Sequence, residues 1–152
     1  MSNKKKIIIG SDHAGFEMKH SIISNLSDIE FKDIGTDSDE SVDYPDYANK
    51  LVKGIQSNSY SFGVLIRGTG IGMSMSANRT KDIRAALCLN TKMAELSRQH
   101  NNANILVLGS RLISVTEAIK CLLVFLNTKF EGGRHQGRLC LLYTSPSPRD
   151  RF

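Results

Sequence analysis

The sequence has no tryptophan, only three prolines and three cysteines, and no long run of apolar residues. The apolar stretch Ile7–Ile9 near the N-terminus is too short for a membrane span or a signal peptide, so we expect a cytoplasmic protein without membrane contact. Cys88, Cys121 and Cys140 are odd in number and far apart, which argues against a disulfide framework and against a zinc knuckle. We interpret them as free thiols, with Cys88 and Cys121 packed in the core.

The formal net charge is +5, yet aromatic residues make up only 7% of the chain and the basic residues are scattered. No nucleic-acid-binding motif accompanies the charge, so we expect no nucleic-acid partner. A small anionic substrate explains the positive charge equally well. The length of 152 residues is suited to one domain with its own core.

Short β-rich runs alternate with longer helical patterns, which predicts an α/β fold with a central five-stranded parallel sheet. Several of the runs are almost continuously apolar, as expected when helices cover both faces of the sheet. The predicted strands are Lys6–Ser11, Glu30–Ile34, Phe62–Ile66, Arg84–Leu89 and Ile105–Gly109. The predicted helices are Gly15–Leu26, Asp46–Ser57, Ile71–Asn78, Thr91–Gln99 and Val115–Asn127.

The chain changes character after Arg138, where two of its three prolines, Pro146 and Pro148, follow and no helical continuation is expected. The text of residues 139–152 resembles the translated read-through of a sequencing-library adapter. We therefore predict a single domain over residues 1–138 and a non-native tail over 139–152. A disordered native tail is the alternative.

The glycine-rich turn Arg67–Gly72 follows a predicted buried strand and opens a helix. Its glycines can expose backbone N–H groups at the positive end of a helix, which is an arrangement suited to an anion. It lacks the Gly-Lys-Ser/Thr of a Walker loop and the spacing of a dinucleotide fingerprint, so nucleotide binding is a weak interpretation. The alternative is a tight turn without a ligand.

Two further segments carry groups that can move protons. Asp12 and His13 follow the first strand and set a carboxylate beside an imidazole, although a plain turn explains them equally well. His100 and Asn101 lie after the fourth helix, where both residue types also suit a helix C-cap. Each segment alone is compatible with either interpretation.

Arg134 and Arg138 are four residues apart near the end of the predicted domain. On a helical turn this spacing places both guanidinium groups on one side, where they can hold a dianionic phosphate. The alternative is an exposed basic helix end.

Five segments in order along residues 5–138 together closely resemble the type B ribose-5-phosphate isomerases, a family that also includes isomerases of allose and galactose 6-phosphate. These segments are Ser11–Phe16, Asp43–Pro45, Gly68–Gly72, Ser97–Asn101 and Gly132–Arg138. The resemblance implies a Rossmann-like three-layer α/β/α sandwich. It also implies a homodimer or homotetramer whose active sites are shared between subunits.

By this resemblance the chain interconverts ribose 5-phosphate and ribulose 5-phosphate in the pentose phosphate pathway, through a cis-enediolate and without a metal or cofactor. His100 matches the family's ring-opening acid, and Asp12 and Thr69 match polar groups that assist it. The enediolate oxygen would be stabilised by the backbone of Gly68, Gly70, Ile71 and Gly72.

The same resemblance assigns substrate-binding roles to five other residues. His13, Arg134 and Arg138 match the residues that hold the phosphate. Tyr44 and Asn101 match positions that line the sugar.

Arg67 departs from the family pattern, because one branch carries its proton-abstracting cysteine there and the other has a glutamate at the position of Met73. A guanidinium stays protonated at physiological pH and is no base. Three explanations fit: a one-nucleotide sequencing error, an inactive or repurposed homologue that binds sugar phosphates, or an alternative base such as His100. A six-carbon sugar phosphate is a further alternative for the substrate.

Overall fold

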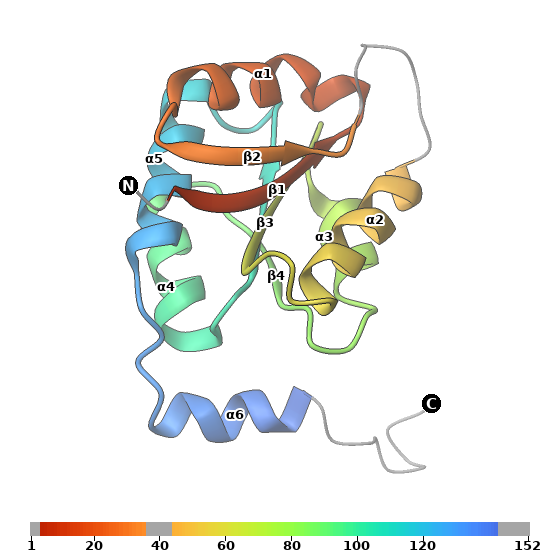
Figure 1. Ribbon diagram of the computed structural model, residues 1–152. Helices are drawn as coiled ribbons and strands as arrows, with labels where there is room; N and C mark the ends of the chain where they lie inside the picture. Colours follow the sequence, from red (N-terminus) through yellow and green to blue (C-terminus); the bar gives the residue numbers. More distant parts are fainter. Residues whose placement is uncertain (1–3, 36–43, 143–152) are drawn as a thin grey trace.

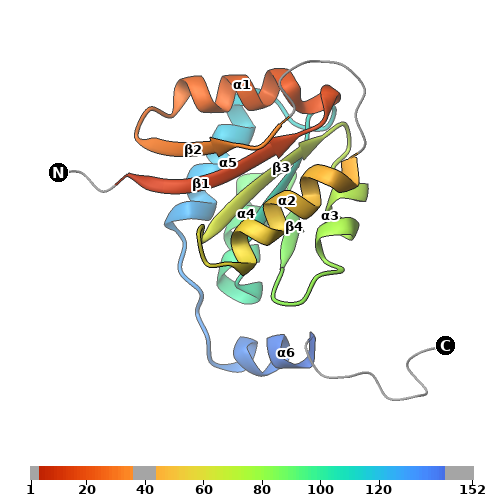
Figure 2. The same cartoon turned by 45° about the vertical axis from the view of Figure 1, so that its right-hand side comes forward.

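The computed structural model describes residues 4–35 and 44–142, with the side chains of residues 44–46 left out. Figures 1 and 2 show a central sheet with helices on both sides and one further helix set apart from this sandwich. In chain order the elements are β1 (Lys5–Ser11), the short 3-10 helix η1 (His13–Gly15), α1 (Phe16–Asn25), β2 (Ile29–Asp33), α2 (Tyr44–Gln56), β3 (Phe62–Arg67), α3 (Ile71–Ala77), β4 (Ala85–Leu87), α4 (Thr91–Asn101), β5 (Ile105–Gly109), α5 (Val115–Asn127) and α6 (Arg134–Leu142).

The sheet has five strands in the order β2-β1-β3-β5-β4, and every neighbouring pair is parallel. The predicted Rossmann-like α/β/α architecture is therefore confirmed. Most element bounds differ from those expected by one or two residues; for example, β4 spans only Ala85–Leu87, and α4 continues to Asn101. The next residue, Asn102, is the C-cap of α4 and adopts a left-handed conformation with φ of 47°.

Alternating side chains of the strands build a core on each face of the sheet. In β1, Ile7 and Ile9 face the core beneath α1, α4 and α5, whereas Ile8 faces the core beneath α2 and α3. All three isoleucines are at most 3% exposed, which explains why the strand is an unbroken apolar run. Cys88 and Cys121 pack in the first core, as expected for thiols that act as small apolar side chains.

The strand order reverses between β1 and β3, and this reversal positions the ligand-binding edge. The chain continues from β1 to β2, which lies on one side of β1 in the sheet. Strand β3 and the later strands lie on the other side of β1. Ser11 pairs with Ile66 at the ends of the two strands, and the Asp12 N–H donates to the Ile66 carbonyl at 3.3 Å. In open α/β sheets the crevice outside such a switch point is where ligands bind.

The expectation that no helix continues beyond Arg138 is wrong, because α6 runs to Leu142. Leucines are good helix formers, and the nearest proline lies four residues after the helix ends. Leu139 is only 5% exposed, so a residue assigned to the tail is packed against the rest of the chain. The position at which the domain ends stays a prediction.

Helix α6 contacts the sandwich at the end of α4 and otherwise lies apart from it, at the bottom of Figure 1. Gly132 and Gly133 precede it with φ of 71° and 58°, a left-handed pair that turns the chain into the helix. Across residues 4–35 and 44–142, no helix has both the length and the apolar character required to cross a bilayer.

Gly109 offers a test of how β5 supports the glycine-rich turn. A Cβ on Gly109 would lie 2.5 Å from the Thr69 carbonyl oxygen and 2.7 Å from its carbon, and neither backbone atom can move without displacing the turn. We expect Gly109→Ala to lower the free energy of unfolding by about 1–3 kcal/mol, measured by urea denaturation. Gly137→Ala is the matched control, since a Cβ there has no neighbour within 4 Å. An unchanged midpoint for Gly109→Ala would contradict this account.

Candidate active site

A pocket of about 160 Å³ opens at the carboxyl ends of β1, β3 and β5, outside the switch point. Five of its lining residues were predicted from the sequence, and Arg111 was not. The lining residues are Asp12, His13, Ala14, Arg67, Gly68, Thr69 and Arg111. The structure thus brings the Asp12–His13 segment and the glycine-rich turn together into one site.

Arg67 forms an ion pair with Asp12 across the floor of this site. The Arg67 Nε donates to Asp12 Oδ2 at 2.7 Å, and the other carboxylate oxygen accepts the Gly15 N–H at 3.1 Å. The Asp12 side chain is 2% exposed and that of Arg67 is 36% exposed. A carboxylate this deeply buried needs such partners, so Arg67 stabilises the charge of Asp12.

The glycine-rich turn is held in shape by contacts within and beneath it. Gly70 has φ of 82°, and a Cβ there would come within 2.7 Å of the Leu87 side chain. The Thr69 hydroxyl accepts the Ile71 N–H at 3.3 Å, which anchors the start of α3, and Gly72 follows within that helix. The turn therefore has little freedom to change conformation when a ligand binds.

Arg111 is the residue that sequence reasoning missed as a member of the site. Its N–H donates to the Gly68 carbonyl at 2.9 Å, and its guanidinium lies 3.3 Å from where a Cβ on Gly68 would be. The sequence did contain a feature that points to Arg111, because Ser110 and Arg111 directly follow β5 at the edge where ligands bind. Together with His13 and Arg67, it surrounds the pocket with groups that attract anions.

Two buried polar atoms near this edge have no hydrogen-bond partner among the described residues: His13 Nδ1 and Ser11 Oγ. Buried polar atoms are normally paired, so exceptions at a site mark groups that a ligand or water can satisfy.

Met73, at the position of the other branch's glutamate, is fully buried in the core beneath α2 and α3.

The remaining predicted residues lie at the opposite edge of the sheet. Helix α4 runs back from the pocket edge, so His100 and Asn101 in its last turn are near the amino ends of the strands. Arg134 and Arg138 are exposed on α6, which packs against that same end of α4. One chain therefore does not bring them to the pocket. Tyr44 begins α2, and its side chain is outside the described part of the chain.

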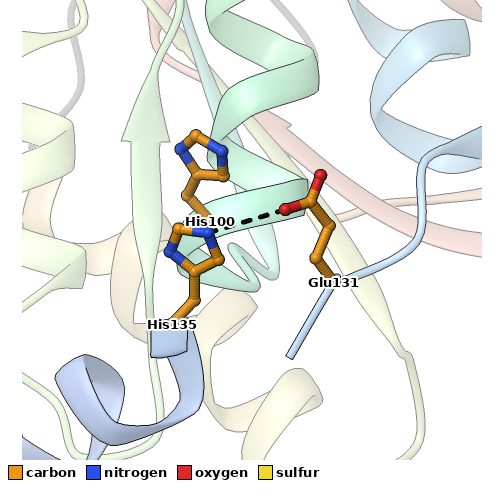
Figure 3. Close-up of side chains that lie close together, drawn as sticks. All are labelled: His100, Glu131 and His135. Atoms are coloured by element: carbon orange, nitrogen blue, oxygen red, sulfur yellow. Dashed lines mark ion pairs between the residues drawn. The ribbon is translucent and has the colours of Figure 1, made fainter. Parts of the chain in front are cut away.

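His100 stacks on His135, with ring centroids 4.2 Å apart and ring planes 14° from parallel, as Figure 3 shows. His135 Nε2 lies 3.5 Å from Glu131 Oε2. Burial lowers the pKa of His135, and the charges of His100 and Arg134 lower it further, while Glu131 opposes them. The net effect favours the neutral form of His135.

A larger cavity of about 550 Å³ also lies at the amino ends of the strands. Its two arginines already hold backbone groups in place: Arg98 donates to the Ala103 carbonyl at 2.7 Å, and Arg84 donates to the Asn102 carbonyl at 2.8 Å. None of the predicted site residues lines it. The smaller pocket beside Asp12 is therefore the better candidate for the chemistry.

Comparison with known proteins shows the family of the chain. Residues 7–142 match the model of the Ribose/Galactose Isomerase family. The chain belongs to that family. It is 42% identical over 137 residues to ribose-5-phosphate isomerase B of Escherichia coli, an alignment covering 89% of this chain and 92% of the other. The predicted resemblance to type B ribose-5-phosphate isomerases is confirmed, and with it the isomerase class of the protein.

Solved structures of the family superpose closely on the chain. A ribose 5-phosphate isomerase of Thermotoga maritima matches with a TM-score of 0.90 and 54% identity, covering 92% of this chain and 98% of that one. Ribose-5-phosphate isomerase B of Mycoplasma genitalium, solved with bound ribulose-5-phosphate, matches with a TM-score of 0.86 and 41% identity over 93% and 95% of the two chains.

None of the three cysteines lines the described pocket. Burial raises the pKa of the Cys88 thiol to about 11 and that of Cys121 to about 12, so both stay protonated at neutral pH. Cys140 is exposed on α6, away from the pocket. A reactive thiolate is therefore absent from the described pocket lining.

This arrangement predicts the reactivity of the three thiols. With a chromogenic disulfide reagent at pH 8, only Cys140 should react rapidly in the folded chain, because the other two are buried and protonated. All three should react in denaturant. Rapid reaction of a second thiol in the folded chain would contradict the burial described for Cys88 and Cys121.

Proposed function

We propose that the chain interconverts ribose 5-phosphate and ribulose 5-phosphate in the cytoplasm as a homodimer or larger homo-oligomer. The observation that carries this proposal is the pocket beside Asp12, where the two motif segments of the family meet at the switch point of the sheet. The ribulose-5-phosphate bound to the Mycoplasma genitalium protein supports the proposed identity of the substrate. The three cysteines are free thiols, which suit a reducing compartment and so support the proposed cytoplasmic location.

The pocket lining suits a phosphorylated sugar. His13 and Arg111 offer a ring N–H and a guanidinium to the anionic groups, and the Thr69 hydroxyl and the backbone of Gly68 can bond to sugar oxygens. Such donors also stabilise the negative oxygen of an enediolate once the C2 proton has left. No metal or cofactor is required for this reaction.

A second copy of the chain would complete the site. The ring-opening acid His100, the sugar-lining Asn101 and the phosphate-holding Arg134 and Arg138 lie at the opposite edge within one chain. Next to the pocket residues, Ile71, Met75 and Leu112 are 47%, 65% and 51% exposed, which is typical of a surface covered by another subunit. We propose that His100 and α6 of the partner subunit face this pocket.

Arg67 separates substrate binding from proton transfer in this proposal. Its guanidinium cannot accept the C2 proton, and its pairing with Asp12 holds it in the pocket lining. The chain as given should therefore bind the sugar phosphate and turn it over slowly. This pairing also favours the second candidate function, a homologue that binds sugar phosphates without catalysis.

Arg67→Cys should raise the rate constant for ribulose 5-phosphate formation by about 100-fold or more, because it supplies a base at the family position. The rate is measured by a coupled absorbance assay, with thermal melting to confirm that the variant is folded. Arg67→Ala is the control, since it removes the guanidinium and adds no base. Equal rates for the two variants would contradict a role for the cysteine.

The alternatives predict different results in the same experiment. A non-catalytic binder would give heat with ribose 5-phosphate in calorimetry and no turnover in any Arg67 variant. An isomerase of six-carbon sugars would show higher kcat/KM for allose or galactose 6-phosphate than for ribose 5-phosphate in Arg67→Cys. High turnover by the unchanged chain would instead identify another base, for which His100 is the candidate.

Shared sites can be tested by complementation between two inactive variants. In the Arg67→Cys background, one variant carries His100→Ala and the other Thr69→Ala, so each damages a different half of the site. After the subunits are exchanged, half of the dimers are mixed and each has one intact site, so roughly a quarter of full activity should return. No recovery, despite proven subunit exchange, would contradict a site built from two chains.

A further inference from the structure

Three potential metal ligands converge where α6 meets the end of α4, at the opposite edge of the sheet from the pocket of the same chain. A ring nitrogen of His100, a ring nitrogen of His135 and a carboxylate oxygen of Glu131 all lie within 4.8 Å of one another. Figure 3 shows the two imidazoles one above the other, with Glu131 to one side of both rings. Two histidines and a carboxylate form a ligand set found in zinc sites that keep an open position.

Backbone hydrogen bonds hold the segments that carry Glu131 and His135. The Glu131 N–H donates to the Gln99 carbonyl at 3.1 Å, which ties the segment before α6 to the residue next to His100. The His135 N–H donates to the Gly132 carbonyl at 3.1 Å in the turn that starts α6. The imidazole of His135 is 5% exposed, so its position is determined by packing.

The distances are close to those that a bound ion needs. With metal–ligand bonds of about 2.0–2.2 Å, tetrahedral ligand atoms lie about 3.3–3.6 Å apart. The 3.5 Å between His135 Nε2 and Glu131 Oε2 already matches this spacing. His100 is only partly buried in the last turn of α4, so a rotation of its ring can bring its nitrogen toward the same point.

We propose that His100, Glu131 and His135 bind a divalent transition-metal ion, with Zn²⁺ as the best fit. Glu131 supplies the negative charge, and its side chain is 51% exposed, which gives the ion access from solvent. The exposed Arg134 and Arg138 on α6 oppose a cation, but solvent and salt screen charges at the surface. Water occupies the fourth position of the ion.

Binding at this site has a consequence that rests on the proposed function. A metal takes the lone pair of the His100 ring nitrogen, so His100 can no longer give or accept a proton there. It also crosslinks α4 to α6, which carries Arg134 and Arg138. The ion is therefore an inhibitor of the isomerase and no part of its reaction.

The test is a titration of the metal-free full-length chain with Co²⁺, followed by displacement with Zn²⁺. Co²⁺ in a tetrahedral site gives visible absorption bands, so the spectrum reports the ligand geometry without any activity assay. We expect one ion per chain and loss of the bands when Zn²⁺ is added. Absence of tetrahedral bands, or binding without saturation, would overturn the proposal.

Matched variants locate the ion. Glu131→Gln retains the shape of an exposed side chain and removes its charge, so the fold should be unchanged while affinity falls at least about tenfold. His135→Ala should lower affinity by a similar or larger factor. Cys140→Ser and His20→Gln are controls that remove other potential ligands on α6 and α1 and should leave the affinity unchanged. Normal binding by Glu131→Gln, or loss of binding in Cys140→Ser, would overturn the site.

Inhibition is measured separately, in the Arg67→Cys variant. Zn²⁺ should slow ribulose 5-phosphate formation, and adding Glu131→Gln should relieve the inhibition by the same factor by which it weakens binding. Inhibition that Glu131→Gln leaves unchanged would overturn the regulatory role of the site. Tetrahedral Co²⁺ binding with no isomerase activity in any variant would support the metal site and count against the proposed function.

Discussion

The parallel pairing of β1 with β3 is the constraint on which the site depends. In its register Ser11, the last residue of β1, lies opposite Ile66, so Asp12 just beyond β1 comes beside Arg67, the last residue of β3. Their 2.7 Å ion pair then fixes the floor of the pocket, because the buried carboxylate has few alternative partners. A shift of one residue would turn each apolar side chain to the other face, so the two cores keep this register in place.

Much of this could be predicted from local sequence. Apolar runs such as Val64–Ile66 identify buried strands, and the connections between them imply a parallel sheet with a binding edge at its carboxyl ends. The Asp12–Arg67 pair could not be predicted, since its partners are 55 residues apart and meet only through the strand register. Arg111 was within reach of the sequence, since it directly follows β5, but its contact with Gly68 depends on the packing of the turn.

The predicted site residues at the opposite edge of the sheet show what a single chain leaves undetermined. Sequence motifs group residues that act together, whereas helix direction separates His100 from the pocket because α4 returns to the opposite edge. The placement of α6 depends on two buried side chains, His135 and Leu139, and on a glycine pair with positive φ. Composition beyond Arg138 suggested a tail, yet the helix-forming leucines outweigh this signal as far as Leu142.

The charges around position 67 also determine how well a base could work there. A thiolate beside the buried Asp12 carboxylate would be disfavoured by like-charge repulsion, which raises a thiol pKa. Arg111 is the nearby positive charge that can offset this effect, and His13 adds to it when protonated. In the present chain Arg67 is already paired with Asp12, so His13 and Arg111 give the pocket its anion-binding character. In the function that we propose, recognition of the sugar phosphate and removal of its proton are supplied by different residues, so a change at position 67 should affect the second far more than the first.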